Sequence, residues 1–318
     1  MKFKALLKKY GIFLVLIVLF TYFALSSKAF FTFGNLINVT RQISMLGIAS
    51  VGMAFVLLLG GIDLSIGSVV TIVNIGVAWL IVKAGVHPVL ACFIALLGSA
   101  SIGFLNGFII AKVKMPPLIV TLSSMIMIEG FAYMICKGVP IFGFPKEFAY
   151  IGQGYIGPIP FPVFVLIFVL LIGAFILNKT YFGRYFYAVG GNEDASKLSG
   201  INVDRVKYMV YALSGLFAGI AGIVMLSRTN SGQVTAGKGF EFDVLTAVVL
   251  GGVSVNGGSG RISNVVAGVL IIGVLSNGLV LLNVSAYVQM VIKGAVLMSA
   301  VGFDCYQKNR KIKHILSK

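Results

Sequence analysis

Charged residues are scarce in this chain, and acidic ones especially so. Only 11% of the 318 residues are charged, and 9 of them are Asp or Glu. A soluble protein of this length carries about 25% charged residues, so the composition excludes an ordinary soluble domain. Hydrophobic residues make up 58% of the chain, which predicts an integral membrane protein.

Histidine and cysteine are also rare, which limits the chemistry available. The chain has two histidines, His87 and His314, and three cysteines, Cys92, Cys136 and Cys305. These residues show neither a metal-ligand spacing nor a Ser/His/Asp or Cys/His arrangement. We therefore predict no metal site and no cofactor, and a polytopic membrane enzyme is disfavoured.

Long polar stretches are few, because ten apolar segments fill most of the sequence. They predict an all-α polytopic membrane protein with about ten transmembrane segments. The eighth is the weakest, since Gly251 and Gly252 interrupt it, and we expect a broken or re-entrant segment there. The ten segments are residues 11–26, 42–59, 64–82, 89–111, 117–136, 161–177, 208–226, 241–255, 263–282 and 286–303.

The net charge of +16 could indicate nucleic-acid binding, but the basic residues lie in short groups between apolar segments. If the N-terminus is cytoplasmic, the cytoplasmic pieces hold 17 Lys and Arg residues and the outer loops hold 7. This asymmetry satisfies the positive-inside rule. It predicts that both termini and residues 178–207 are cytoplasmic, and that no nucleic acid is bound. The first segment is expected to be a retained anchor rather than a cleaved signal peptide.

Residues 187–207 form the longest strongly polar block in the sequence. Asn192 is a good helix N-cap, and Gly200 suits a left-handed helix end. Acidic residues follow Asn192, where the helix dipole favours negative charge. A helix of about two turns is unstable alone, so we expect it to dock onto a soluble partner. The predicted docking residues are Gly191, Asn192, Glu193, Asp194, Ala195, Ser196, Lys197, Leu198, Ser199 and Gly200.

Polar side chains within the apolar segments are a second candidate for function. Such groups are costly in a membrane and suggest a passage for a solute, although interhelical hydrogen bonds are the alternative for each. A different pattern, Gly215-Leu-Phe-Ala-Gly219, predicts a close contact between two helices. The candidate passage residues are Asn74, Asn106, Glu129 and Asn277.

Two glycine-rich interruptions of the apolar pattern resemble each other. The first, Gly60-Gly-Ile-Asp-Leu-Ser-Ile-Gly-Ser68, places Asp63 near a hydrocarbon boundary. There we expect its carboxylate to cap a helix that starts at Leu64. The second interruption contains Gly251 and Gly252. Because broken helices often border a translocation path, we predict a structural or gating role for Asp63 and for this glycine pair.

Two short strings look like nucleotide-binding motifs, but neither has the required context. Gly152-Gln-Gly-Tyr-Ile-Gly157 lacks a preceding parallel strand, and prolines follow where a helix should begin. Gly232-Gln-Val-Thr-Ala-Gly-Lys-Gly239 lacks the final Ser or Thr of a phosphate-binding P-loop. The chain is therefore not expected to bind ATP by itself.

Four motifs in a fixed order resemble one family, the permease subunits of bacterial ATP-binding cassette (ABC) importers for ribose and related monosaccharides. Residues 60–68 look like its first signature and residues 190–201 like its coupling loop. Residues 236–243 look like its late outer loop, and residues 250–262 like the glycine-rich turn that follows. The resemblance covers nearly the whole chain.

The resemblance implies a function and a set of partners. It implies one permease domain over residues 1–318, in the bacterial cytoplasmic (inner) membrane, with a cytoplasmic coupling loop at about 178–207. A ribose-like pentose or a hexose would cross the lipid bilayer by alternating access. The implied partners are a second permease subunit, an extracytoplasmic sugar-binding protein, and a cytoplasmic ABC ATPase with two nucleotide-binding domains, which hydrolyses the ATP.

The sequence departs from the family's pattern at three positions, and it also allows one rival function. Ser123 and Glu129 stand where the family usually has Gly and Arg, and Val234 stands where Pro is common. A reversed charge within an apolar segment leaves the exact sugar open. The rival is an ion-coupled secondary transporter with Asp63 or Glu129 as the proton carrier, but it leaves the polar block unexplained.

Overall fold

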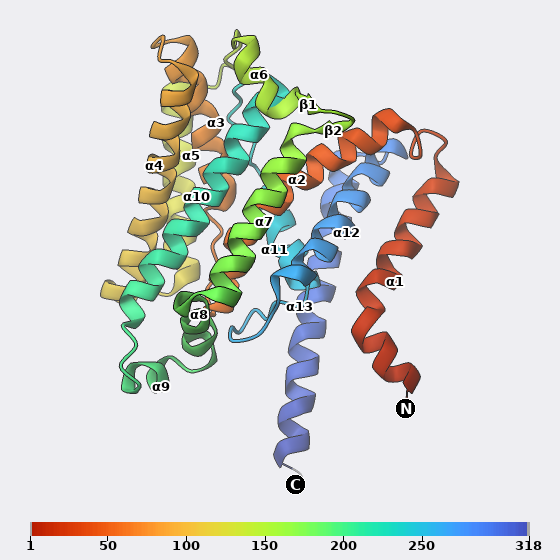
Figure 1. Ribbon diagram of the computed structural model, residues 1–318, viewed down its shortest axis with the longest axis vertical. Helices are drawn as coiled ribbons and strands as arrows, with labels where there is room; N and C mark the ends of the chain where they lie inside the picture. Colours follow the sequence, from red (N-terminus) through yellow and green to blue (C-terminus); the bar gives the residue numbers. More distant parts are fainter. Residues whose placement is uncertain (1, 317–318) are drawn as a thin grey trace.

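The computed structural model describes residues 2–316 and the side chains of residues 11–306. Helices dominate this part of the chain, and its only strands form one short antiparallel pair (Figure 1). The all-α class predicted from the sequence is therefore confirmed. The elements in chain order are α1 (Lys2–Ser26), α2 (Phe33–Leu58), α3 (Ile66–Val82), α4 (Pro88–Phe108), the π-helix η1 (Ile109–Val113), α5 (Pro117–Cys136), α6 (Lys146–Gln153), β1 (Tyr155–Ile156), β2 (Ile159–Pro160), α7 (Phe161–Lys179), α8 (Tyr181–Gly191), α9 (Glu193–Leu198), α10 (Val203–Thr229), α11 (Phe240–Leu250), α12 (Ile262–Leu281) and α13 (Ala286–Leu316).

Each of the ten apolar segments falls on a helix, and seven of these helices are long and apolar enough to cross a membrane. They are α2, α4 with η1, α5, α7, α10, α12 and α13; α1 and α3 contribute shorter apolar helices. In contrast, α11 has only 11 residues. At 1.5 Å per residue it spans about 16 Å, about half of the hydrocarbon thickness of a bilayer. The chain is a polytopic membrane protein, and the number of ten spans stays a prediction.

An inner set of helices is surrounded by an outer one. In α2, α10 and α12, 89%, 72% and 67% of the most apolar stretch is buried. The corresponding values are 17% for α4, 22% for both α5 and α7, and 0% for α13. Helix α2 runs through the middle of the bundle and packs against both α10 and α12 (Figure 1). The exposed apolar side chains of the outer helices suit contact with lipid.

Glycines bring α4 and α10 into close contact. A Cβ atom on Gly103 of α4 would overlap the backbone of α10, and one on Gly107 would lie 2.9 Å from the Lys207 carbonyl oxygen. From the other side, a Cβ atom on Gly215 or Gly219 would overlap atoms of α4. The close contact predicted for the Gly215–Gly219 pattern is therefore confirmed, and it fixes α10 beside the residues described below.

Helix α6 and the β1–β2 hairpin lie at one end of the bundle, and the sequence did not predict them. Ser227 of α10 holds α6, because its hydroxyl donates to Phe148 O at 2.6 Å and accepts from Gly152 N at 2.7 Å. The glycine string at 152–157 thus lies at the end of α6 and in an antiparallel hairpin. It has no parallel strand and helix of the kind that a dinucleotide site requires.

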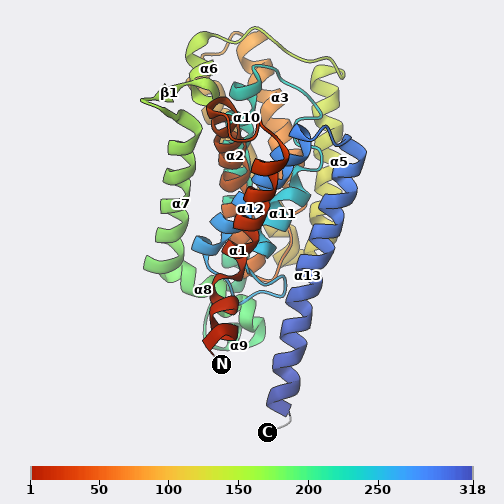
Figure 2. The same cartoon turned by 90° about the vertical axis from the view of Figure 1, so that its right-hand side faces the viewer.

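The opposite end of the bundle carries α8 and α9. Figures 1 and 2 both place the N-terminal end of α1 and the C-terminal end of α13 at this same end, away from α6 and the hairpin. The arrangement agrees with a topology in which the two termini and residues 178–207 share one side of the membrane. Which side that is stays a prediction from the charge asymmetry.

Candidate functional site

Helix α9 is built as the sequence predicts. Asn192 Oδ1 accepts a hydrogen bond from Ala195 N at 2.9 Å, which caps the first turn. Gly200 has a φ of 82° and closes the helix in the left-handed conformation, and Ile201 N donates to Ser196 O at 3.1 Å. Both the N-cap and the helix end predicted at these residues are confirmed.

The apolar residues of α9 point away from the rest of the chain. Leu198 is 91% exposed, and Ala195 is exposed as well. Of residues 191–200, only Ser196 is buried. A six-residue helix has too few internal hydrogen bonds to be stable by itself, so contacts with the remainder of the chain must hold it. Docking of its exposed face onto a partner stays a prediction.

Ion pairs fix α9 to α10 and, nearby, α10 to the end of η1. Lys207 Nζ of α10 lies 2.9 Å and Lys197 Nζ 2.7 Å from the carboxylate of Glu193. Partial burial opposes ionisation of Glu193, but hydrogen bonds from both lysines outweigh it and hold its pKa below the ordinary value. Lys112 of η1 pairs in the same way with Asp204 at 3.0 Å.

Backbone contacts between glycines join α8 to both glycine-rich breaks. A Cβ atom on Gly190 would overlap the carbonyl oxygen of Leu58 at the end of α2, and it would lie 2.7 Å from Gly258 N. Gly258 N in turn donates to Leu58 O at 2.9 Å. A Cβ atom on Gly257 would lie 2.8 Å from Gly60 Cα. We call Leu58, Gly60, Gly190, Gly257 and Gly258 the glycine junction; through it, the chain segment that carries α9 touches both breaks.

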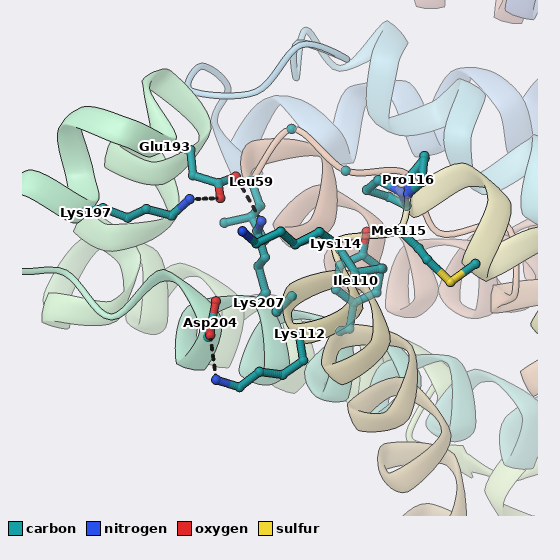
Figure 3. Close-up of a pocket in the computed structure, with 15 residues that line it drawn as sticks. Leu59, Ile110, Lys112, Lys114, Met115, Pro116, Glu193, Lys197, Asp204 and Lys207 are labelled. Atoms are coloured by element: carbon teal, nitrogen blue, oxygen red, sulfur yellow. Dashed lines mark hydrogen bonds and ion pairs between the residues drawn. The ribbon is translucent and has the colours of Figure 1, made fainter.

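Beside α9 lies a pocket of about 800 Å³ (Figure 3). Its walls come from α9, α10, η1, the η1–α5 connection and the residues after α2. Figure 3 shows the Glu193 pairs and the Lys112–Asp204 pair around it, with Lys114 reaching into the same space. Tyr211 of α10 lines the pocket from within the bundle. The pocket therefore separates α9 from the first break.

Asp63 lies in the first break and is only 1% exposed. Its carboxylate accepts hydrogen bonds from the N–H and the hydroxyl of Ser65, and from Ser214 Oγ of α10 at 2.8 Å. Asn106 of α4 donates to Ser65 Oγ at 3.1 Å, and Ser124 of α5 donates to Asn106. This Asp63 network connects α4, α5, α10 and the start of α3.

The helix start predicted at Leu64 is wrong. Helix α3 begins at Ile66, and its N-cap residue Ser65 makes no side-chain capping bond. Asp63 instead accepts from the N–H two residues on, at 3.0 Å. An aspartate carboxylate commonly stabilises such a turn, which delays the helix. A structural or gating role for Asp63 stays a prediction.

In the second break, a carboxylate comes from another helix. Gly252 has a φ of 77°, and a Cβ atom on Gly251 would lie 2.7 Å from the backbone of α12. Asp304 of α13 accepts from Ser254 Oγ at 3.2 Å and from Val255 N at 3.4 Å. The two glycines thus allow a turn and a close approach, and their part in gating stays a prediction.

The structure does not bring the four predicted passage residues together. Asn74 of α3 accepts from Gln233 N at 2.9 Å, while its Nδ2 has no partner among the residues described. Asn277 of α12 exchanges two hydrogen bonds with Asn35 of α2, at 2.9 and 3.0 Å. Glu129 is half-buried on α5. The hydrogen bonds to Asn35 account for a polar side chain at Asn277 within an apolar helix. A role in the passage stays a prediction for all four residues.

Sequence reasoning missed three residues that the structure places at these sites, Tyr211, Ser214 and Asp304, and it included Lys207 in the coupling loop without giving it a role. Lys207 had a detectable signal, since it follows Asp204 by three residues at the polar end of α10. Tyr211 and Ser214 lie one and two turns farther into an apolar helix, and no local pattern distinguishes them. The partner of Asp304 lies 50 residues away in sequence.

Comparison with known proteins places the chain in a family. The model of the family described as "Branched-chain amino acid transport system / permease component" matches residues 35–301. The chain belongs to this family. It is therefore a permease component and a multi-pass protein of the cytoplasmic membrane, as predicted from the sequence.

Curated relatives match the permease over nearly their whole length. The ribose import permease protein RbsC of Bacillus subtilis is 43% identical over 304 residues, which cover 95% of this chain and 94% of the relative. RbsC of Escherichia coli K12 is 42% identical over 305 residues, or 95% of both chains. The L-arabinose transport system permease protein AraH of Escherichia coli K12 is 39% identical, covering 95% and 92%. No solved structure matches the chain.

Proposed function

We propose that this chain is the membrane-spanning subunit of an ABC importer and carries a monosaccharide, most simply ribose or a similar pentose. The structural observation that carries the proposal is α9. It is a capped, ion-paired helix with a leucine 91% exposed, at the end of the bundle shared by both termini (Figure 1). The names of the ribose and arabinose permeases that it resembles support the substrate class.

In this proposal, a movement of the ATPase displaces α9, and the displacement reaches the helical bundle by two routes. Through Glu193 it pulls on Lys207 and so on α10, which carries Ser214 of the Asp63 network. Through the end of α8 it moves the glycine junction, where atoms of α2 and of both breaks meet. A packed junction of this kind passes on displacement because it has no free space to absorb it. ATP itself is hydrolysed by the partner.

The proposed assembly contains three kinds of partner: a cytoplasmic ABC ATPase with two nucleotide-binding domains, an extracytoplasmic sugar-binding protein and a second permease subunit. The outer helices support the second subunit, because α5 and α13 leave most of their apolar surface unburied in the single chain. With α9 on the cytoplasmic side, as the charge asymmetry predicts, the α6 and hairpin end would face the binding protein (Figure 1).

For the passage, we propose that Asn74 and Glu129 contact the solute, and that Asn106 and Asn277 hold helices together. Asn74 Nδ2 has no hydrogen-bond partner among the described residues, and α5, which carries Glu129, packs on the helix of Asn74. Sugars need hydrogen-bonding groups along their route, and weak binding permits release. Asn106 and Asn277, in contrast, have their amides bonded to side chains of other helices or of the first break.

The test is to change the exposed face of α9 without touching its interior. Leu198→Asp should abolish sugar uptake and co-purification of the ATPase while the permease stays in the membrane, because a charge replaces the apolar contact. Leu198→Met is the matched control and should retain at least half of both. Full uptake by Leu198→Asp in cells without another copy of the permease would refute the coupling role of α9.

A further inference from the structure

The pocket beside α9 has the size and composition of a binding site for a small solute. At about 800 Å³ it lies within the range of ligand pockets. Its lining residues come from α9, α10, η1, the η1–α5 connection and the residues after α2. Neither the coupling helix nor the passage, as proposed above, requires a cavity here.

Positive charge predominates in the pocket. Four of its lining residues are lysines and two are acidic. The carboxylates of Glu193 and Asp204 already pair with three of the lysines. The fourth, Lys114, has no ion pair with any side chain in the described range 11–306, and Figure 3 shows it directed into the pocket. The pocket thus has two positive charges in excess.

Tyr211, which lines the pocket, carries a buried hydroxyl group. Tyr211 is 1% exposed, yet its Oη has no hydrogen-bond partner among the described residues. Gly61 packs directly against this hydroxyl, since a Cβ atom there would overlap Tyr211 Oη. An unpaired buried hydroxyl costs about 1–3 kcal/mol. A bound acceptor oxygen would remove that cost.

We propose that this pocket binds a phosphate group, either of a small cytoplasmic solute or of a lipid headgroup. Lys114 supplies the charge, Tyr211 donates a hydrogen bond, and the paired Lys112, Lys197 and Lys207 surround the anion. The carboxylates of Glu193 and Asp204 remain held by their lysines. Ammonium groups with a hydroxyl donor are the chemistry that recognises a phosphate oxygen.

Occupation of the pocket would slow transport, and this consequence rests on the proposed function. The walls belong to α9, α10 and the η1–α5 connection, which move relative to one another if α9 couples to an ATPase. A ligand that contacts several walls stabilises the arrangement in which they are close. The phosphate-bearing ligand, from either source, therefore inhibits transport from the side of α9.

Binding is tested on the full permease chain in nanodiscs of phosphatidylcholine, with inorganic phosphate as the probe and its phosphorus NMR linewidth as the readout. The wild type should broaden the signal. Lys114→Met should abolish the broadening. Tyr211→Phe should weaken affinity about tenfold, as for a lost hydrogen bond to a charged group. Lys179→Met, an exposed lysine outside the pocket on α7, is the control and should bind as the wild type does.

The two sources of phosphate are then separated. In nanodiscs that also contain phosphatidylglycerol, unchanged binding of inorganic phosphate identifies a soluble ligand, and loss of binding identifies a lipid headgroup. Equal linewidths for the wild type, Lys114→Met and Tyr211→Phe in phosphatidylcholine would overturn the proposal and leave a water-filled pocket.

Regulation is measured with the complete transporter in proteoliposomes. Phosphate on the α9 side should lower uptake by the wild type at least threefold more than uptake by Lys114→Met. Equal inhibition of both would overturn the regulatory role. If the complex transports no sugar, the proposed function fails, whereas the nanodisc result still decides the phosphate site.

Discussion

The two glycine-rich breaks look alike in sequence but are stabilised differently. Gly60-Gly61-Ile62-Asp63 carries its own carboxylate, which is buried and hydrogen-bonded by α10. Gly251-Gly252-Val253-Ser254 has no acidic residue, and Asp304 of α13 supplies a carboxylate that remains partly exposed. The first break is therefore stabilised from the inside of the bundle and the second from its outside.

The difference indicates which break tolerates movement. Every donor around Asp63 is held in a buried network, so displacement would leave polar groups unpaired away from water. Water can replace Asp304, because its bonds to the second break lie at a partly exposed site and are long, at 3.2 and 3.4 Å. The two breaks still touch at the glycine junction, so a movement of one break displaces the other.

The largest effect is expected from removal of the buried carboxylate. Asp63→Leu leaves Ser65 and Ser214 without their acceptor, at about 1–3 kcal/mol for each buried group. The yield of monodisperse protein in detergent should fall at least fivefold. Asp304→Leu is the counterpart in the second break and should keep most of the yield, since water replaces its bonds. Equal yields for the two variants would show that the breaks do not differ in this way.

The next effect tests the contact between the breaks. Gly190→Ala forces a Cβ atom against Leu58 O and should cost about 1–3 kcal/mol through overpacking. Its neighbour provides a close control, because a Cβ atom on Gly191 would meet nothing within 4 Å. We expect a lower thermal unfolding midpoint for Gly190→Ala only, together with reduced uptake; Gly191→Ala controls for stability alone, because Gly191 is itself a predicted docking residue. A normal midpoint and uptake in Gly190→Ala would mean that the junction is loose.

The smallest effect defines how far the Asp63 network extends. Asn106→Leu removes a donor to Ser65 and an acceptor for Ser124, so folded yield should fall while uptake per complex is kept. Asn277→Leu leaves only the half-buried Asn35 without its partner and should lower the yield less. Both yields are measured beside sugar uptake. Normal yield with lost uptake at either position would instead place that residue in the passage.

Local patterns allowed much of this fold to be predicted. Ten apolar segments all fall on helices, and Asn192 and Gly200 delimit α9 as expected, because hydropathy and capping depend on residues a few positions apart. The prediction failed at Leu64, where a turn made by Asp63 displaced the helix start to Ile66. The Asp63 carboxylate could either cap a helix or stabilise a turn. The local sequence does not decide between the two, because the partner that holds this carboxylate, Ser214, is remote in sequence.

The sequence by itself determined the membrane location, the helices and the capped α9, since each follows from composition or from short-range hydrogen bonding. Only the tertiary structure decided that the two breaks meet at the glycine junction, that Ser214 binds Asp63 across 151 residues, and that a basic pocket lies beneath α9. These contacts form only when the helices pack, because close packing brings together residues that are far apart in the sequence.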